Sequence, residues 1–187
     1  MLFTFRIQIA DINKPPVWRK LVVPDNFNFD RFHKVIQAAF GWYDYHLYQF
    51  SERGYNSDWF IGIPSPDDYD YGEVKDSKKI KLSKIFQMKG QKLNYLYDFG
   101  DSWNHSLTLE SITEGKATIA DCIGGKGKCP PEDCGGPWAY ENLKAILADP
   151  QNKEHIEMKE WLALDEDEVF DPAFFDLEAT RQLVKSI

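Results

Sequence analysis

Several classes of protein are disfavoured by what this 187-residue sequence lacks. No apolar run approaches the roughly 20 residues that a membrane-spanning helix needs, and the N-terminus has no basic lead followed by an apolar segment. We therefore expect a cytoplasmic protein that makes no use of a membrane. The G-x-S-x-G, H-E-x-x-H, P-loop and dinucleotide motifs are also absent, which disfavours the enzyme classes that they mark.

Cysteine and positive charge are both scarce. The chain has three cysteines, an odd number that fits reduced thiols or a metal site better than a disulfide framework. Lysine and arginine total 22 against 30 aspartates and glutamates, for a formal net charge of −8. This charge opposes non-specific binding to nucleic-acid phosphates or anionic lipid, so any nucleic-acid contact needs locally concentrated positive charge.

Aromatic side chains and regular apolar spacing are abundant by contrast. Aromatics make up 15% of the chain, and alternating apolar residues predict strands at residues 3–9 and 17–23. A helical stripe predicts a helix over residues 28–40, with Asn28 or Asp30 at its start and a glycine at its end. The order strand, strand, helix, strand predicts an α+β fold with a β-grasp-like mixed sheet and a helix across one face.

We expect residues 1–187 to form a single α+β domain. Residues 1–120 are the predicted sheet-rich core, and residues 121–136 form a loop too rich in glycine and proline for a regular element. Residues 137–187 supply a C-terminal helical segment packed on that core. The acidic, turn-rich stretch at 64–72 is typical of a solvated loop and lacks the ligand spacing of a calcium loop.

The most informative stretch is residues 95–110, which alternation predicts to be a β-hairpin with turn chemistry at its centre. Its tip carries Asp98, Asp101 and His105. A scaffold hairpin rarely holds so many ionisable groups, because each must be solvated or partnered. We therefore take the hairpin tip as the first candidate for a site.

The hairpin register decides what these groups can do. A loop of residues 99–102 places Asp98 opposite Trp103 and within diagonal reach of His105, whereas a three-residue loop pairs Asp98 with Asn104 and turns His105 away. An Asp–His couple orients an imidazole for acid–base work or metal binding. In the alternative, the aspartates hold the turn through backbone amides and His105 is a satisfied core residue.

The cysteine loop is the second candidate, as a metal site. Cys122, Cys129 and Cys134 are separated by six and four residues, whereas zinc sites usually bring two ligands close together in a C-x₂₋₄-C pair. A fourth ligand such as His105 or His155 would have to come from elsewhere. Zinc is therefore one possible cofactor, and buried thiols in a tightly turned connector are the alternative.

The same loop has a second possible use, as an anion pocket. Its glycine-rich backbone runs into the start of a predicted helix at Pro137, where free amides face outward, and Lys126 and Lys128 are near in sequence.

We interpret His33 and His46 as structural residues. His33 borders the apolar stripe of the predicted helix, and His46 lies where the third strand is expected. Neither is predicted to be a site residue.

The sequence resembles the plasmid Ri ORF-3-like family over nearly the whole chain, with the motifs in the family's order. The segments that carry the resemblance are Pro15-Pro16-Val17-Trp18-Arg19, Gly41-Trp42 with His46-Leu47, Tyr97-Asp98-Phe99-Gly100-Asp101-Ser102-Trp103-Asn104-His105, Cys129-Pro130-Pro131-Glu132-Asp133-Cys134-Gly135-Gly136, and Phe170-Asp171-Pro172 with Phe174-Phe175-Asp176-Leu177. The resemblance implies a cytoplasmic α+β protein of bacteria or archaea, found on chromosomes, on plasmids and as a passenger of some insertion elements. Copies there carry a resolvase label, but this sequence has no serine-centred, arginine-rich region and no basic tail to support it. The family implies no established activity.

Our leading hypothesis is a non-catalytic module that binds a protein, a peptide or a small anion on a face made by the hairpin tip and the cysteine loop. Trp103, Trp138 and Tyr140 would supply contact area. The ionisable residues of the tip would set the orientation of the ligand.

The alternative is a metal-dependent hydrolase or nuclease-like enzyme that uses Asp98, Asp101 and His105 as ligands or acid–base groups. That alternative requires the three side chains to converge on one open point. DNA binding linked to mobile elements is the weakest hypothesis because the chain is acidic.

Overall fold

The N-terminal alternation folds into the hairpin on which the sheet is built. The computed structural model describes residues 1–65 and 74–187, so most of the predicted acidic loop lies outside the described residues. β1 (Leu2–Asn13) and β2 (Pro16–Pro24) pair antiparallel, and every second side chain along most of β1 is buried. Burial of one face of a strand is what period-two spacing of apolar residues produces.

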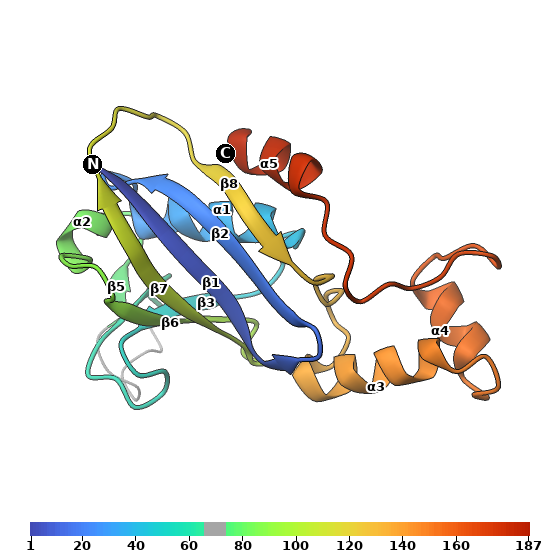
Figure 1. Cartoon of the computed structure of the whole chain (residues 1–187). Helices are drawn as coiled ribbons and strands as arrows, with labels where there is room; N and C mark the ends of the chain where they lie inside the picture. Colours follow the sequence, from blue (N-terminus) through green and yellow to red (C-terminus); the bar gives the residue numbers. More distant parts are fainter. Residues whose placement is uncertain (66–73) are drawn as a thin grey trace.

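The described strands form one mixed sheet in the order β5-β4-β3-β6-β7-β1-β2-β8 (Figure 1). The other strands are β3 (Tyr48–Ser51), β4 (Phe60–Gly62), β5 (Val74–Asp76), β6 (Lys92–Tyr97), β7 (Trp103–Thr113) and β8 (Asp121–Lys126). Strands β4 and β5 pair parallel, and the other neighbours are antiparallel. The predicted combination of a mixed sheet with helices is therefore present, while the closer likeness to a β-grasp fold stays a prediction.

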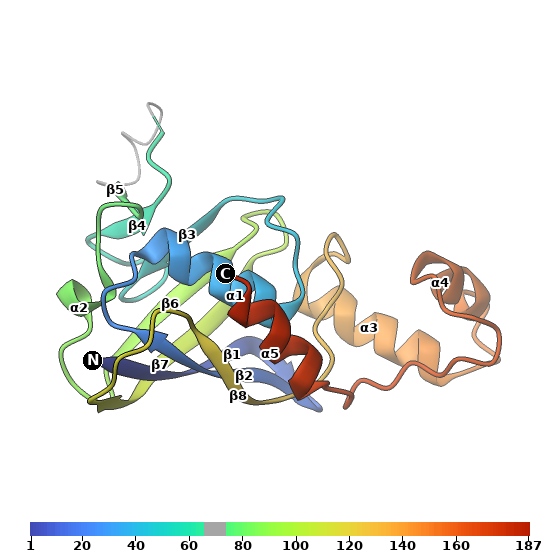
Figure 2. The same cartoon turned by 90° about the horizontal axis from the view of Figure 1, so that it is seen from above.

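Helix α1 (Phe29–Phe40) begins and ends as its sequence predicts. The Asn28 side chain accepts a hydrogen bond from the Arg31 backbone N–H at 2.9 Å, and Gly41 ends the helix with a φ of 80°. Its apolar stripe packs against the sheet, with the rings of Phe32 and Phe5 4.8 Å apart. Figure 2 shows α1 and α5 (Leu177–Lys185) on the same side of the sheet.

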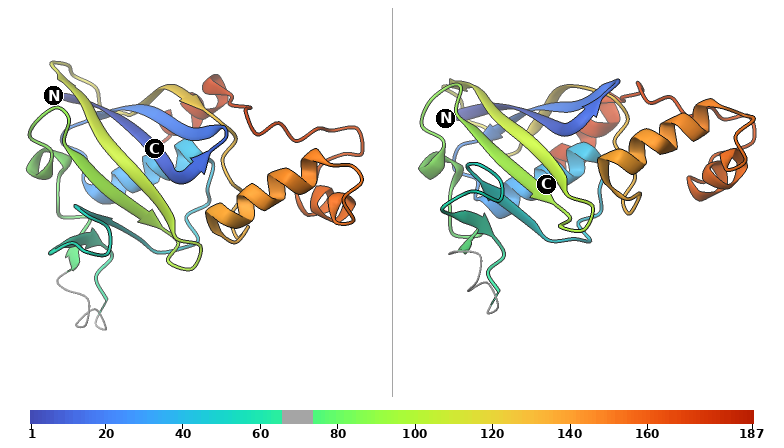
Figure 3. Two further views of the ribbon diagram at one scale, coloured as in Figure 1. Left: turned by 60° about the horizontal axis from the view of Figure 1, so that its bottom comes forward. Right: turned by 90° about the horizontal axis from the view of Figure 1, so that it is seen from below.

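The remaining helices contact the core to different extents. After the short α2 (Leu82–Ile85), α3 (Gly136–Ala148) starts beside one end of the sheet and leads away from it to α4 (His155–Trp161) (Figure 3). Helix α4 has no buried residue. The C-terminal segment is thus packed on the core through α5 and α3. In the described part of the chain, no helix combines the length and apolar character that crossing a bilayer requires.

The prediction that residues 121–136 hold no regular element is wrong, because β8 occupies their first third. β8 pairs with β2 at the edge of the sheet, so its glycines weaken the pairing with one neighbouring strand only. A Cβ on Gly125 would lie 2.5 Å from the ring of Phe175. The glycine content therefore makes room for the C-terminal segment to pack on the strand.

Candidate functional site

The hairpin tip adopts neither of the two registers expected from the sequence. Tyr97 pairs with Trp103 as the last rung of the β6–β7 ladder, and Tyr95 faces His105 directly. Residues 98–102 form the connection, in which Asp98 has a φ of 54°. Asp98 therefore lies outside the ladder, while His105 points into the core with Tyr95.

His105 is a buried core residue and does not meet Asp98. Its Nδ1 lies 2.9 Å from the carbonyl oxygen of Trp103 and 3.3 Å from that of Tyr95. Because a carbonyl only accepts hydrogen bonds, Nδ1 carries the proton of the neutral ring. Complete burial lowers the pKa of His105 to about 4. The three residues of the hydrolase hypothesis, Asp98, Asp101 and His105, are thus not brought together at an open point.

This burial predicts a loss of stability in acid. The unfolded chain binds a proton at His105 near pH 6.5, whereas the folded protein binds it only near the lowered pKa of about 4. The stabilisation is therefore fully present above pH 6.5 and is lost as the pH falls towards 4, by about 3 kcal/mol in all. Urea unfolding at pH 7 and pH 4.5 measures it. His105→Leu should show a smaller decrease than the wild type, and an equal decrease in both would contradict this account.

The two aspartates of the tip bind backbone amides. Asp98 Oδ1 accepts hydrogen bonds from the backbone N–H groups of Gly100 at 2.9 Å and Asp101 at 3.3 Å. Asp101 Oδ2 accepts one from Gly135 at 3.0 Å, at the start of α3. The chain's own carboxylate thus occupies the helix start that the sequence suggested as an anion pocket.

Of the three aromatic residues predicted to contact a ligand, two are in the core. Trp103 and Tyr140 are fully buried, and the Tyr140 hydroxyl donates a hydrogen bond to the Lys128 carbonyl at 2.9 Å. Trp138, by contrast, is 82% exposed. Trp138 alone of these three is therefore placed to touch an outside molecule.

The cysteines are not assembled into a ligand set. Cys122 is buried and its Sγ lies 3.6 Å from the Gly124 carbonyl oxygen. Burial raises the pKa of the Cys129 thiol, and raises that of Cys134 to about 12, so both stay protonated at neutral pH. Among the described residues, the side-chain group with the spacing of a metal site contains no cysteine.

A different set of side chains converges at the hairpin tip. His46 Nε2 lies 3.1 Å from Asp133 Oδ1 and 3.6 Å from Asp98 Oδ2. The three candidate ligand atoms all lie within 4.8 Å of one another. They come from three segments: residues 42–47 between α1 and β3, the hairpin tip, and residues 129–136 before α3. We call the place where these segments meet the junction. Sequence patterning gave no signal for His46 or Asp133, because their proximity is created by the fold.

Hydrogen bonds hold the junction together. Trp42 Nε1 donates to the Pro130 carbonyl at 2.9 Å, and the Tyr43 backbone N–H donates to Glu132 Oε2 at 3.0 Å. The Tyr97 hydroxyl donates to the other oxygen of Glu132. The 129–136 segment is thereby attached both to residues 42–47 and to the end of β6.

A buried network fixes residues 42–47 from the α1 side. His33, which is buried rather than at a rim, has Nε2 2.7 Å from Asp44 Oδ1 and Nδ1 2.8 Å from the Tyr95 hydroxyl. Gln37 Nε2 donates to that same hydroxyl at 2.9 Å. Desolvation lowers the pKa of His33 despite the partly exposed Asp44. This network gives the loop that carries His46 a defined backbone.

Residues 42–47, the hairpin tip and the first turn of α3 also expose large apolar side chains. The rings of Tyr43 and Tyr45 stack with their centroids 5.7 Å apart, and both are more than 70% exposed. Leu47, Phe99 and Trp138 are exposed as well. We call these five residues the aromatic face.

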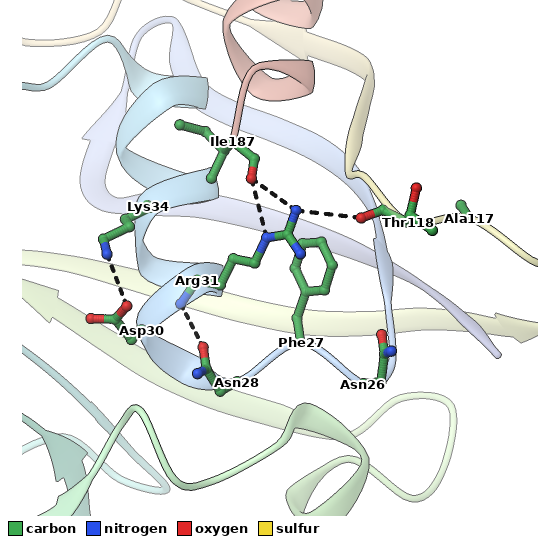
Figure 4. A pocket seen from close by; sticks show the side chains of 9 residues that line it. All are labelled: Asn26, Phe27, Asn28, Asp30, Arg31, Lys34, Ala117, Thr118 and Ile187. Carbon is green, nitrogen blue, oxygen red and sulfur yellow. Dashed lines mark hydrogen bonds and ion pairs between the residues drawn. The ribbon is translucent and has the colours of Figure 1, made fainter.

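A pocket of about 630 Å³ lies elsewhere, beside the N-terminal end of α1 (Figure 4). Its basic side chains are Lys34, which pairs with Asp30 at 2.9 Å, and Arg31, whose Nη2 donates to the carbonyl oxygens of Ile187 at 2.9 Å and Thr118 at 3.3 Å. The guanidinium also lies 3.8 Å above the Phe27 ring. Arg31 thus connects α1 to the C-terminal segment. Its Nε and Nη2 groups already donate hydrogen bonds to carbonyl oxygens of the protein itself.

Comparisons with known proteins identify a family model and similar proteins. The family model described as plasmid pRiA4b ORF-3-like protein matches residues 1–179. A protein of Sinorhizobium fredii named uncharacterized protein y4hQ is 40% identical over 155 residues, which cover 79% of this chain and 74% of that protein. The crystal structure of a protein of unknown function, MM3350 from Methanosarcina mazei Go1, superposes with a TM-score of 0.78 at 34% identity. That match covers 95% of this chain and 96% of the other.

Proposed function

The chain belongs to the plasmid pRiA4b ORF-3-like family, and from this premise we propose a non-catalytic module that binds a protein or peptide segment. The similar proteins bear names that state no activity. The binding surface in this proposal is the aromatic face. The cytoplasmic setting and the occurrence on mobile elements that the resemblance implies stay predictions.

The observation that carries this proposal is the exposure of large apolar side chains on a fixed backbone. Tyr45 is 74% exposed and Trp138 is 82% exposed, and residues of these types dominate the energy of many interfaces. The backbone of Tyr45 is already held by its N–H bond to the Tyr97 hydroxyl and by the bond from the Tyr43 N–H to Glu132, and Trp138 lies in helix α3. A preorganised surface loses less conformational entropy on binding, which favours recognition.

Charge indicates the chemistry of the partner. Asp44 and Asp133 have side chains that are 42% and 70% exposed among the apolar residues of the junction. Complementary potentials favour a partner of opposite sign. We therefore expect a segment with apolar side chains flanked by lysine or arginine. The small-anion alternative loses support because Asp101 occupies the start of α3.

Panning a random peptide library against the full chain tests the proposal. We expect an enriched basic and apolar consensus whose affinity falls at least about tenfold in Tyr45→Ala and in Phe99→Ala, because each removes a large contact. Tyr55→Ala is the matched control, since Tyr55 is also exposed but lies outside the junction. The proposal fails if no consensus is enriched, or if the selected peptides bind the Tyr45→Ala and Phe99→Ala proteins as well as the wild type.

A further inference from the structure

We propose that His46, Asp98 and Asp133 bind one divalent first-row transition-metal ion, such as Zn²⁺. This site goes beyond the proposed peptide binding and does not depend on it. It differs from both metal sites suggested by the sequence, because it uses neither His105 nor a cysteine.

The spacing of the donor atoms fits a metal site. The distances from His46 Nε2 to Asp133 Oδ1 and Asp98 Oδ2 are 3.1 Å and 3.6 Å. With metal–ligand bonds of about 2.1 Å, neighbouring ligands of an octahedral or tetrahedral ion stand about 3.0 to 3.4 Å apart. Small side-chain rotations would therefore bring the three atoms to coordination distance.

The directions of approach also favour a metal over an internal ion pair. His46 Nε2 is shielded from solvent, and neither carboxylate approaches it with hydrogen-bond geometry, although Asp133 Oδ1 lies at ion-pair distance. A hydrogen bond needs its partner along the axis of the ring nitrogen. An ion on that axis draws the other ligands to its sides, so metal binding does not need either carboxylate to lie on the axis.

Asp98 is held ready to ligate. Its Oδ1 is engaged by two backbone amides of the turn, so Oδ2 remains for the ion. The residue is buried, and the two amide bonds to Oδ1 hold its carboxylate in place. The ring of His46 packs edge-on against Tyr97, with the centroids 5.8 Å apart. Such supporting contacts preorganise the ligands of a metal.

The donor set defines the class of ion. One imidazole with two carboxylates suits Zn²⁺, Mn²⁺ and related ions, whereas Ca²⁺ and Mg²⁺ prefer oxygen ligands alone. Asp133 is 70% exposed, so the remaining coordination positions are open to water or to a donor atom from an outside molecule. The ion would also tie residues 42–47, the hairpin tip and the 129–136 segment to one another.

Isothermal titration of the tag-free, EDTA-dialysed full chain with ZnCl₂ tests the site. We expect one Zn²⁺ per chain, and an affinity that falls at least about tenfold in His46→Gln and in Asp133→Asn. Asp133→Asn replaces an exposed side chain, so it tests the site without threatening the fold. Titration with CoCl₂ should give d–d absorption without a thiolate-to-cobalt charge-transfer band.

Two control variants make the result decisive. His155→Gln changes a histidine that bonds the Ile146 carbonyl outside the junction, and the double variant Cys129→Ser with Cys134→Ser removes two thiols near it. Both should retain stoichiometric Zn²⁺. The proposal is overturned if the wild type shows no saturable binding of either metal, if His46→Gln and Asp133→Asn bind like the wild type, or if only the cysteine variant loses the ion. Each of these outcomes leaves the peptide-panning result unaffected, so the two proposals fail separately.

Discussion

Replacing Arg19 with methionine is expected to lower the free energy of unfolding by about 3 to 5 kcal/mol. Arg19 is 3% exposed. Its Nε donates to the Ala39 carbonyl at 2.8 Å, and Nη1 and Nη2 each donate to the Gly127 carbonyl at 3.1 Å. Methionine fills a similar volume but leaves these buried carbonyls without donors, which costs more than the bonds themselves contribute. Urea denaturation at pH 7 measures the loss.

Arg6→Met is the matched control for this prediction. Arg6 lies on the neighbouring strand β1, bonds the Gln8 side chain at 3.3 Å and lies 4.1 Å above the Trp18 ring in a partly exposed position. Its replacement should cost about 1 kcal/mol or less. Equal losses of stability in the two variants would show that the carbonyl groups around Arg19 find other hydrogen-bond donors. Arg19 would then not be the residue that holds α1 to the chain after β8.

The environment of Arg19 also bears on the junction. The guanidinium lies 4.2 Å above the Phe175 ring, and its bonds to Gly127 hold the chain just before the 129–136 segment begins. A buried cation surrounded by carbonyl oxygens and aromatic rings has its hydrogen bonds satisfied without a carboxylate partner. Arg19 therefore positions one of the three segments that meet at the hairpin tip.

Local patterns in the sequence were sufficient for most of the framework. Alternation placed β1 and β2, and a helical stripe with Asn28 and Gly41 at its ends placed α1. These signals are local, since each depends on residues a few positions apart. The sequence did not predict β8, because its glycines are poor strand formers. The role of Gly125 is to make room for Phe175, a residue far along the chain.

The candidate site was only partly predictable for the same physical reason. The sequence pointed to the hairpin tip, which holds Asp98 of the proposed metal site, but an error of one residue in the register reverses every side chain of a strand. The five-residue connection sends His105 into the core. His46 and Asp133 reach Asp98 from segments about 50 and 35 positions away in the chain, and no spacing rule connects such residues.

Replacing Gly136 with alanine should destabilise the protein by about 3 kcal/mol and weaken Zn²⁺ binding at the proposed site. Gly136 has a φ of +82°, and a Cβ there would lie 2.6 Å from the Asp101 carbonyl oxygen. The backbone strain and the steric contact both add to the cost. Relief of the contact must move the hairpin tip away from the start of α3, which separates Asp98 from Asp133. Urea unfolding and titration with ZnCl₂ measure the two effects.

Gly90→Ala separates the backbone strain from the contact. Gly90 has a φ of +87°, but a Cβ there would meet nothing within 4 Å, so alanine should cost only about 1 to 2 kcal/mol and leave Zn²⁺ binding unchanged. The difference between the two variants is then the energy of the close approach between α3 and the hairpin tip. If Gly136→Ala costs no more than Gly90→Ala, that approach is loose. A loose junction cannot hold Asp98 and Asp133 at ligand spacing without the ion, so the metal would have to assemble its own site.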